Sequence, residues 1–176
     1  MLTVAIFTYK RLNRLNRCIL SLQSNYISEI LIFNDDEINL LKKEDLNISV
    51  ELENLIKIFN PIDFGFSDRN FRKPIYLNQA VEIAKNELIL FSDDDGIFSP
   101  GAIDKHYNAL QHHHFSAGGI IRSRFINKIS KTILQGTNYA FRKKLYNAIG
   151  QYDESFVKSM GGGDVDFWYR LYNYVS

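Results

Sequence analysis

A chain of 176 residues is long enough to bury one hydrophobic core and short for two domains. Hydrophobic residues make up 45% of it and charged residues 23%, a composition that excludes an intrinsically disordered chain. The net charge of +1 provides no strong field for nucleic acid or an anionic membrane, so we expect no nucleic-acid partner.

The N-terminal stretch MLTVAIFTYKR contains an apolar run that is too short for a membrane span, and it lacks the flanks of a signal peptide. No other stretch approaches the ~20 apolar residues that a span needs. Cys18 is the single cysteine and cannot form an internal disulfide, which fits a reducing compartment. We therefore expect a cytoplasmic protein without a membrane span, at most peripheral to a membrane.

The N-terminal part of the chain predicts a strand, a helix and a second strand. Residues 2–7 are continuously apolar, as in a strand covered on both faces, and residues 29–33 repeat this pattern before Asn34, Asp35 and Asp36. Between the two runs, apolar residues recur at helical spacing over residues 12–22. This order predicts a βαβ unit with a parallel sheet.

The middle of the chain predicts a further helix and strand after a weaker region. Residues 37–55 favour a helix and leave room for a short strand, 55–59 favour a strand, and 63–73 favour a loop. A helical stripe from Leu77 to Ala84 precedes an apolar strand at 88–91, which runs directly into Asp93, Asp94 and Asp95.

The second half departs from simple alternation. Ser99-Pro100 predicts a helix start, with the serine as cap, and residues 115–141 favour extended structure with turns. A short helix closed by Gly150 should follow, and then a last helix after residues 161–163. The last helix should carry one apolar face, formed by Trp168, Leu171, Tyr172 and Val175. Without a linker or repeat, we expect one α/β domain with a mostly parallel sheet flanked by helices.

Acidic residues stand where predicted strands end. In open α/β sheets ligands bind beyond the carboxyl ends of the strands, so these side chains should face a crevice. Asp36 could bond a nucleobase or a ribose, or it could simply form a turn. The run from Asp93 to Asp95 has an electrostatic cost unless a cation offsets it, and carboxylates are ligands for Mg²⁺ or Mn²⁺. The alternative is a solvated acidic turn; an aspartyl phosphatase is disfavoured because Ile97 stands where its motif needs Thr or Val.

Three further candidates have structural alternatives. Asp164 follows three glycines and opens a helix, where an aspartate is also a favoured cap. Arg11 and Arg72 fall in predicted loops and could pair with a diphosphate, although a loop arginine is usually solvated. The run of histidines from His112 to His114 cannot share one helix face, so we interpret it as surface and not as a metal cluster.

The order of these features resembles the family 2 inverting glycosyltransferases of GT-A fold, especially the spore-coat polysaccharide type. The segments that carry the resemblance are VAIFTYKRLNRLNRCILSLQS, EILIFNDDE, RKPIYLNQAVEIAKNELILFSDDDGIFSP, GTNYAFRKKLYNAIGQYDESF and GGGDVDFWYRL. They cover nearly the whole chain in family order, with a nucleotide-binding half at about 1–98 and an acceptor-side half at about 99–176.

The resemblance also implies the roles of individual residues. It implies a nucleotide-diphosphate sugar donor, UDP by default, a glycan or lipid-linked acceptor, and Mn²⁺ or Mg²⁺ as cofactor. Asp164 would be the general base of a single inverting displacement, and Asp95, with Asp93 beside it, would bind the metal. The nucleotide-binding residues would be Thr8, Tyr9, Arg11, Asp36, Arg72 and Asp94.

Two departures keep other interpretations open. Many relatives have Glu-Asp where this chain has Gly163-Asp164, although the spore-coat type also lacks that glutamate. The chain ends at its last predicted helix, whereas relatives usually continue, so we expect either a minimal catalytic core or a truncated one. A non-catalytic nucleotide- or glycan-binding relative is therefore an alternative. A sugar nucleotidyltransferase ranks lower, because it would carry a glycine-rich loop where this chain has TYKR after the first strand.

Overall fold

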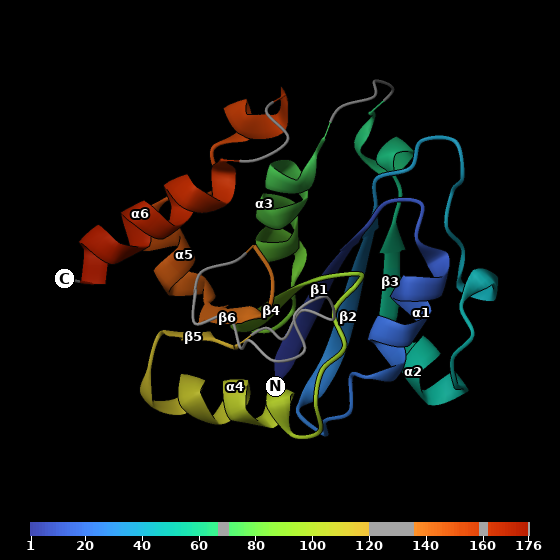
Figure 1. The fold of residues 1–176 in the computed structure, drawn as a ribbon, viewed down its shortest axis with the longest axis horizontal. Coiled ribbons are helices and arrows are strands. Elements are labelled where there is room, and N and C mark those ends of the chain that lie inside the picture. Colours follow the sequence, from blue (N-terminus) through green and yellow to red (C-terminus); the bar gives the residue numbers. More distant parts are fainter. Residues whose placement is uncertain (67–70, 120–135, 159–161, 176) are drawn as a thin grey trace, which may run out of the picture.

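The computed structural model of the protein describes residues 1–66, 71–119, 136–158 and 162–175. Within these ranges a six-stranded sheet has the order β3-β2-β1-β4-β6-β5 (Figure 1). Strands β1 to β4 run parallel, and β6 runs antiparallel to both of its neighbours. The strands are β1 Leu2–Thr8, β2 Ile27–Asn34, β3 Ile56–Phe59, β4 Leu88–Asp93, β5 Phe115–Ala117 and β6 Tyr139–Arg142.

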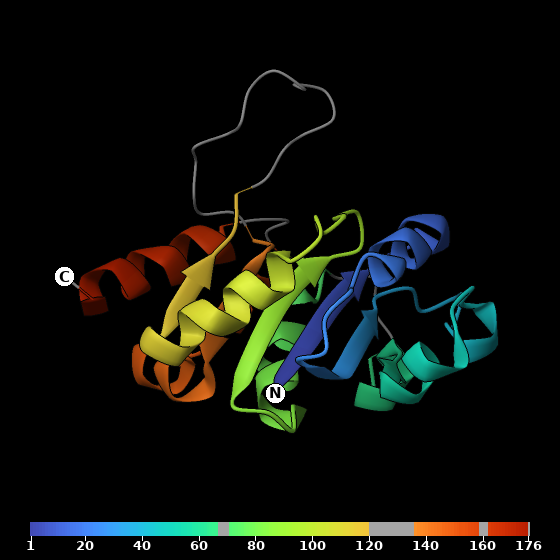
Figure 2. The same ribbon diagram turned by 90° about the horizontal axis from the view of Figure 1, so that it is seen from below.

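Helices cover both faces of the sheet, as Figure 2 shows with α4 on the near side and α3 on the far side. The central strands are apolar at nearly every position, because alternate side chains enter two separate cores. One core lies under α1, α2 and α4, and the other under α3, α5 and α6. The helices are α1 Leu12–Leu20, α2 Val50–Leu55, α3 Lys73–Ile83, α4 Ala102–His112, α5 Lys143–Ile149 and α6 Gly163–Val175, with short 3-10 turns η1 Lys43–Asp45, η2 Pro61–Phe64 and η4 Glu154–Lys158.

Within the described ranges the predicted elements are confirmed in kind, with three differences in detail. Most of the extended stretch expected at 115–141 lies outside those ranges, at residues 120–135. Residues 37–55 contain η1 and α2 but no strand. The cap predicted at Ser99 is wrong: α4 begins two residues later than expected, after Gly101 at φ 74°, and the carbonyl of Ser99 only closes a turn with the N–H of Ala102. The expectation for Tyr172 is also wrong, since its side chain is 67% exposed while Trp168 and Leu171 are buried.

The sheet register brings several chain segments to one edge. Phe7 of β1 pairs with Phe33 of β2 and with Asp93 of β4, so these three strands end side by side. The strand order reverses between β1 and β4, which is the position where open α/β sheets bind ligands. Because β6 is antiparallel, the residues just before it reach the same edge, where the N–H of Asn138 donates to the carbonyl of Phe91 at 2.9 Å.

No helix in the described part of the chain is long and apolar enough to span a membrane.

Candidate functional site

Asp94 lies at the switch point between β1 and β4 and is fixed by both neighbours. Its Oδ2 accepts a hydrogen bond from the Thr8 hydroxyl at 2.7 Å, and its Oδ1 accepts one from Arg11 Nη1 at 3.2 Å. Burial raises the pKa of Asp94, and the bond from Thr8 and the charge of Arg11 oppose that rise. Thr8, Arg11 and Asp94 therefore form one connected group, as expected for residues that share a ligand pocket.

Asp95 contacts Arg11 of this group but is far more exposed than Asp94. Its side chain is 48% exposed and lies 3.3 Å from Arg11 Nη1 and 3.6 Å from Arg14 Nη1. Ion pairs between exposed side chains contribute little to stability, because water and salt screen them. Replacing these arginine contacts by a bound metal ion would therefore lose little free energy of stabilisation at Asp95.

Asp93 is held from two sides at the end of β4. Lys73, the first residue of α3, donates from Nζ to Asp93 Oδ1 at 2.6 Å and to the carbonyl of Gly136 at 2.9 Å. The N–H of Asp93 donates to Thr137 Oγ1 at 2.8 Å. Burial raises the pKa of Asp93, the Lys73 ammonium opposes the rise, and the charges of Asp95 and Asp164 add to it. Lys73 thus joins α3, β4 and the segment before β6.

The pair of aspartates after β2 divides into two environments. Asp35 Oδ1 accepts from Arg72 Nη1 at 2.7 Å, and Oδ2 accepts from the Arg72 N–H at 3.3 Å. Arg72 is 1% exposed, and its guanidinium lies 5.3 Å from the centre of the Phe66 ring. Burial raises the pKa of Asp35, and Arg72 opposes this. Arg72 is therefore a buried ion-pair partner and not a solvated loop arginine.

Asp36 instead folds back on its own turn. Oδ1 accepts from the N–H groups of Ile38 and Asn39, and Oδ2 accepts from Asn39 Nδ2 at 2.7 Å. Burial alone would raise the pKa of Asp36, but these hydrogen bonds hold it below its usual value. Its turn-forming role is thus visible in the structure, and its contact with a nucleobase stays a prediction.

Asp164 lies in the first turn of α6. The Tyr152 hydroxyl donates to Asp164 Oδ1 at 3.3 Å, and a Cβ added at Gly136 would collide with the same carboxylate. No backbone N–H within the described ranges donates to the Asp164 side chain, although a carboxylate in the first turn of a helix is also favoured by the helix dipole. The charge of Asp164 contributes to the raised pKa of Asp93, which places the two carboxylates in one electrostatic environment.

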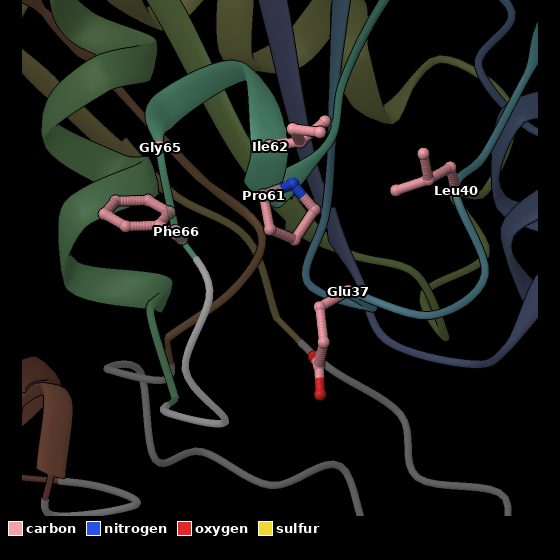
Figure 3. A pocket seen from close by; sticks show the side chains of 6 residues that line it. All are labelled: Glu37, Leu40, Pro61, Ile62, Gly65 and Phe66. Carbon is pink, nitrogen blue, oxygen red and sulfur yellow. The ribbon is translucent and has the colours of Figure 1, made fainter.

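Two hollows adjoin these residues. A pocket of about 420 Å³ lies between the loop after β2 and η2, lined by Glu37, Leu40, Pro61, Ile62, Gly65 and Phe66 (Figure 3). A smaller one of about 130 Å³ lies between the start of α3 and the start of α6, and Lys73, Tyr152 and Asp164 contribute its polar wall. The site therefore has a hollow at the β2–β3 end and another at the α6 end.

The carboxylates after β4 fit one kind of metal binding. In the described ranges, no three His, Cys, Asp or Glu side chains are grouped so that they could enclose an ion. Mg²⁺ and Mn²⁺ are commonly held by one or two carboxylates, with phosphates and water completing the shell. Exposed Asp95, with Asp93 two residues earlier, suits a hard cation that arrives with a phosphate ligand.

Comparison with known proteins decides the family. The family model described as "Glycosyl transferase family 2" matches residues 3–161, which is most of the chain. The chain belongs to glycosyl transferase family 2. No curated protein matches its sequence significantly.

Solved structures similar to this family 2 chain establish its fold. S. aureus TarS 1-349 aligns with TM-score 0.63 and 15% identity, covering 97% of this chain and 55% of that one. The mannosyltransferase PcManGT from Pyrobaculum calidifontis, solved with GDP-Man and Mn²⁺, aligns with TM-score 0.65 and 13% identity over 97% and 51%. TarS 1-349 solved with UDP-GlcNAc gives TM-score 0.61 and 15% identity over 97% and 53%. The expected GT-A fold is confirmed, and this family 2 chain spans about half the length of these neighbours.

The predicted site residues of this family 2 chain fall into connected and separate groups. Thr8, Arg11, Asp94 and Asp95 form one connected group, in which Thr8 and Arg11 bond Asp94 and Arg11 also bonds Asp95. Tyr9 stands at the rim, 47% exposed, with the Lys10 ammonium 4.8 Å from its ring centre. Asp93 and Asp164 adjoin through Lys73 and Gly136. In the part of the chain that the structure describes, the side chains of Asp36 and Arg72 bond neither group: Asp36 bonds its own turn after β2, and Arg72 pairs with Asp35.

Sequence reasoning missed three residues of the site. The sequence pattern puts Lys73 at the end of a predicted loop, and its contact with Asp93, 20 residues later, depends on the fold. Asp36 is the predicted site residue and Asp35 is not, because nothing in the sequence shows which of two adjacent carboxylates pairs with Arg72. Tyr152 gives no local signal, since its bond to Asp164 depends on how the segment between α5 and η4 packs against α6.

Proposed function

We propose that this protein is an inverting, metal-dependent glycosyltransferase that moves a sugar from a nucleotide-diphosphate sugar to a hydroxyl of a glycan or lipid-linked acceptor. The observation that best supports this proposal is a cluster of carboxylates and cations at the switch point of the sheet. In it, Arg11 bonds Asp94 and Asp95, Lys73 bonds Asp93, and the charge of Asp164 acts on Asp93. The TarS structures with UDP and UDP-GlcNAc support a UDP-sugar as donor. The likeness of the sequence to the spore-coat polysaccharide type is part of the same proposal.

The nucleotide would bind along the edge formed by β1, β2 and β4, in the half of the chain before about residue 98. Thr8 and Arg11 fix Asp94, which faces the ribose, and Tyr9 offers an exposed ring at the rim. The pocket beside Phe66 has apolar walls suited to a nucleobase, next to Asp36 and to the Asp35–Arg72 pair. In this proposal Arg72 acts by holding Asp35 at the nucleotide edge.

The diphosphate would lie near Asp95, where Arg11 and Arg14 can turn toward phosphate oxygens. Asp95 and Asp93 would hold the Mn²⁺ or Mg²⁺ ion, which stabilises negative charge on the departing diphosphate when it is bound. Lys73 would keep Asp93 in place through its Nζ contact of 2.6 Å.

Asp164 would act as the general base from the acceptor side, in the half of the chain after about residue 99. The acceptor oxygen forms a bond to the anomeric carbon while the bond from that carbon to the diphosphate oxygen breaks. The acceptor proton passes to the Asp164 carboxylate, and one displacement inverts the anomeric centre. A positioned base contributes about 10²–10⁴-fold to such a step. A cytoplasmic location, which the single buried cysteine favours, completes the proposal.

The test compares the parent protein with Asp164→Asn. Thermal shift with UDP, GDP, CDP and dTDP, each with and without Mn²⁺, identifies the nucleotide, because a ligand that binds only the folded state raises its stability. Release of UDP from UDP-GlcNAc, or of GDP from GDP-mannose, is then measured with a panel of oligosaccharide acceptors.

Asp164→Asn should keep its melting temperature and its Mn²⁺-dependent nucleotide affinity while transfer falls about 10²-fold or more. A rate within a few-fold of the parent would remove Asp164 from the mechanism. Nucleotide binding with no turnover in any combination would instead identify a binding module.

A further inference from the structure

Two buried tyrosines form a hydrogen-bonded chain behind Asp164. The hydroxyl oxygens of Tyr139 and Tyr152 lie 2.9 Å apart, and the Tyr152 hydroxyl donates to Asp164 Oδ1 at 3.3 Å. Because Tyr152 uses its proton on Asp164, the proton between the two phenols comes from Tyr139. Burial raises the pKa of both tyrosines, so both remain donors at neutral pH. The Tyr139 hydroxyl thus donates to Tyr152, and the Tyr152 hydroxyl donates to one carboxylate oxygen of Asp164.

The ring of Tyr152 is held rigidly in this position. Asn78 of α3 accepts from the Tyr152 N–H at 3.0 Å and donates to the Tyr152 carbonyl at 3.0 Å. The ring stacks on Phe167 with centroids 4.4 Å apart and an interplanar angle of 7°. Phe167 lies three residues after Asp164 on α6, on the same side of the helix. Tyr152 therefore fixes both the helix and the carboxylate that the helix carries.

The other oxygen of Asp164, Oδ2, is the carboxylate atom nearest to the place where a Cβ on Gly136 would stand. The carbonyl of Gly136 accepts from Lys73, which also bonds Asp93. Oδ1 thus accepts a hydrogen bond from the Tyr152 hydroxyl, and Oδ2 lies next to Gly136, whose carbonyl is bonded to Lys73.

We propose that Tyr152, backed by Tyr139, is a positioning residue for the Asp164 carboxylate. It engages Oδ1 so that Oδ2 is the oxygen presented to the acceptor hydroxyl. This inference rests on the proposed function, since it assigns to Tyr152 the orientation of the base and no contact with substrate. Tyr152 gains and loses no proton in the reaction; the acceptor proton goes to Oδ2.

The test removes single hydroxyl groups and measures transfer with the donor and acceptor found active above. Tyr152→Phe should lower kcat about 10- to 100-fold, because a misplacement of about 1 Å can cost about 10²-fold. The KM for the donor and the Mn²⁺-dependent nucleotide affinity should stay at the parent values. Tyr139→Phe should give a smaller loss of the same kind.

The matched control is Thr3→Val, which also removes a buried hydroxyl but one that donates to Glu29 Oε2 at 2.9 Å and bonds neither Tyr152 nor Asp164. Its melting temperature should fall about as much as that of Tyr152→Phe, while its kcat stays near the parent value. Equal losses of kcat in the two variants would overturn the inference, because they would trace the loss to packing.

A double-mutant cycle with Asp164→Asn separates this inference from the proposed function. If Tyr152 acts through Asp164, Tyr152→Phe should not lower the residual rate of Asp164→Asn further. Additive losses would overturn the positioning role and leave the base intact. An Asp164→Asn variant with near-parent transfer would contradict the proposed function itself. An unchanged kcat in Tyr152→Phe beside a slow Asp164→Asn would contradict only the inference.

Discussion

Substitution of Gly136 by alanine tests whether the Asp164 carboxylate must occupy its observed place. A Cβ at this position would stand 2.6 Å from Asp164 Cγ and 2.8 Å from Oδ1, and closer still to Oδ2, whereas ordinary contact begins at about 3.4 Å. Asp164 is a short side chain, so rotation of its carboxylate relieves the overlap most easily. The oxygens must then move by about 1 Å. Such a displacement of a reacting group can cost about 10²-fold in rate.

We expect Gly136→Ala to lower transfer about 10²-fold and to leave Mn²⁺-dependent nucleotide affinity near the parent value. The assay is nucleotide release with the active donor and acceptor pair, alongside melting temperature and nucleotide titration. Gly119→Ala is the matched control, because a Cβ there meets nothing within 4 Å among the described residues. A folded Gly136→Ala protein that transfers within a few-fold of the parent would refute the reasoning. Loss of nucleotide affinity would show that the Gly136 segment had moved in place of Asp164.

Three further predictions concern the metal, the nucleotide and pH. Asp95→Asn should abolish any strengthening of nucleotide binding by Mn²⁺, since an amide is a poor ligand for a hard cation; equal titrations with and without Mn²⁺ in the parent would contradict this. Asp36→Ala should weaken nucleoside diphosphate binding by about 1.5–3 kcal/mol with circular dichroism unchanged, and unaltered affinity would leave Asp36 a turn former alone. The side chain of His106 forms hydrogen bonds with Ser116 and Asn138, and burial lowers its pKa. Between this lowered pKa and the ordinary histidine pKa of about 6.5, the unfolded chain binds more protons than the folded chain does. The free energy of unfolding should therefore fall as pH drops through that window, and it should fall less in His106→Gln.

The elements that carry the fold could be predicted because their signals are local. Residues 2–7 and 88–91 are continuous apolar runs, and strands buried on both faces need that composition. The acidic residues after β2 and β4 were expected to face one crevice, since parallel strands present their carboxyl ends at one edge. The bonds from Thr8 and Arg11 to Asp94 join the ends of β1 and β4. The aspartates after β2 bond other partners, Asp36 its own turn and Asp35 the side chain of Arg72. The start of α4 was misplaced because a left-handed Gly101 ends the preceding turn, and an equally good serine cap stands just before it.

The contacts that refine the site depend on the relative placement of elements far apart in the chain. Lys73 and Asp93 are 20 residues apart and belong to a helix and a strand whose sequence patterns are satisfied without the ion pair between them. Tyr139, Tyr152 and Phe167 fit an apolar core equally well by composition, and only the packing of α6 on η4 and β6 directs one hydroxyl at Asp164. A hydroxyl hidden in a core has to find an acceptor, because an unmade hydrogen bond there costs about 1–3 kcal/mol. In this fold the acceptor that Tyr152 finds is the proposed base, so one contact serves the stability of the core and the orientation of the carboxylate.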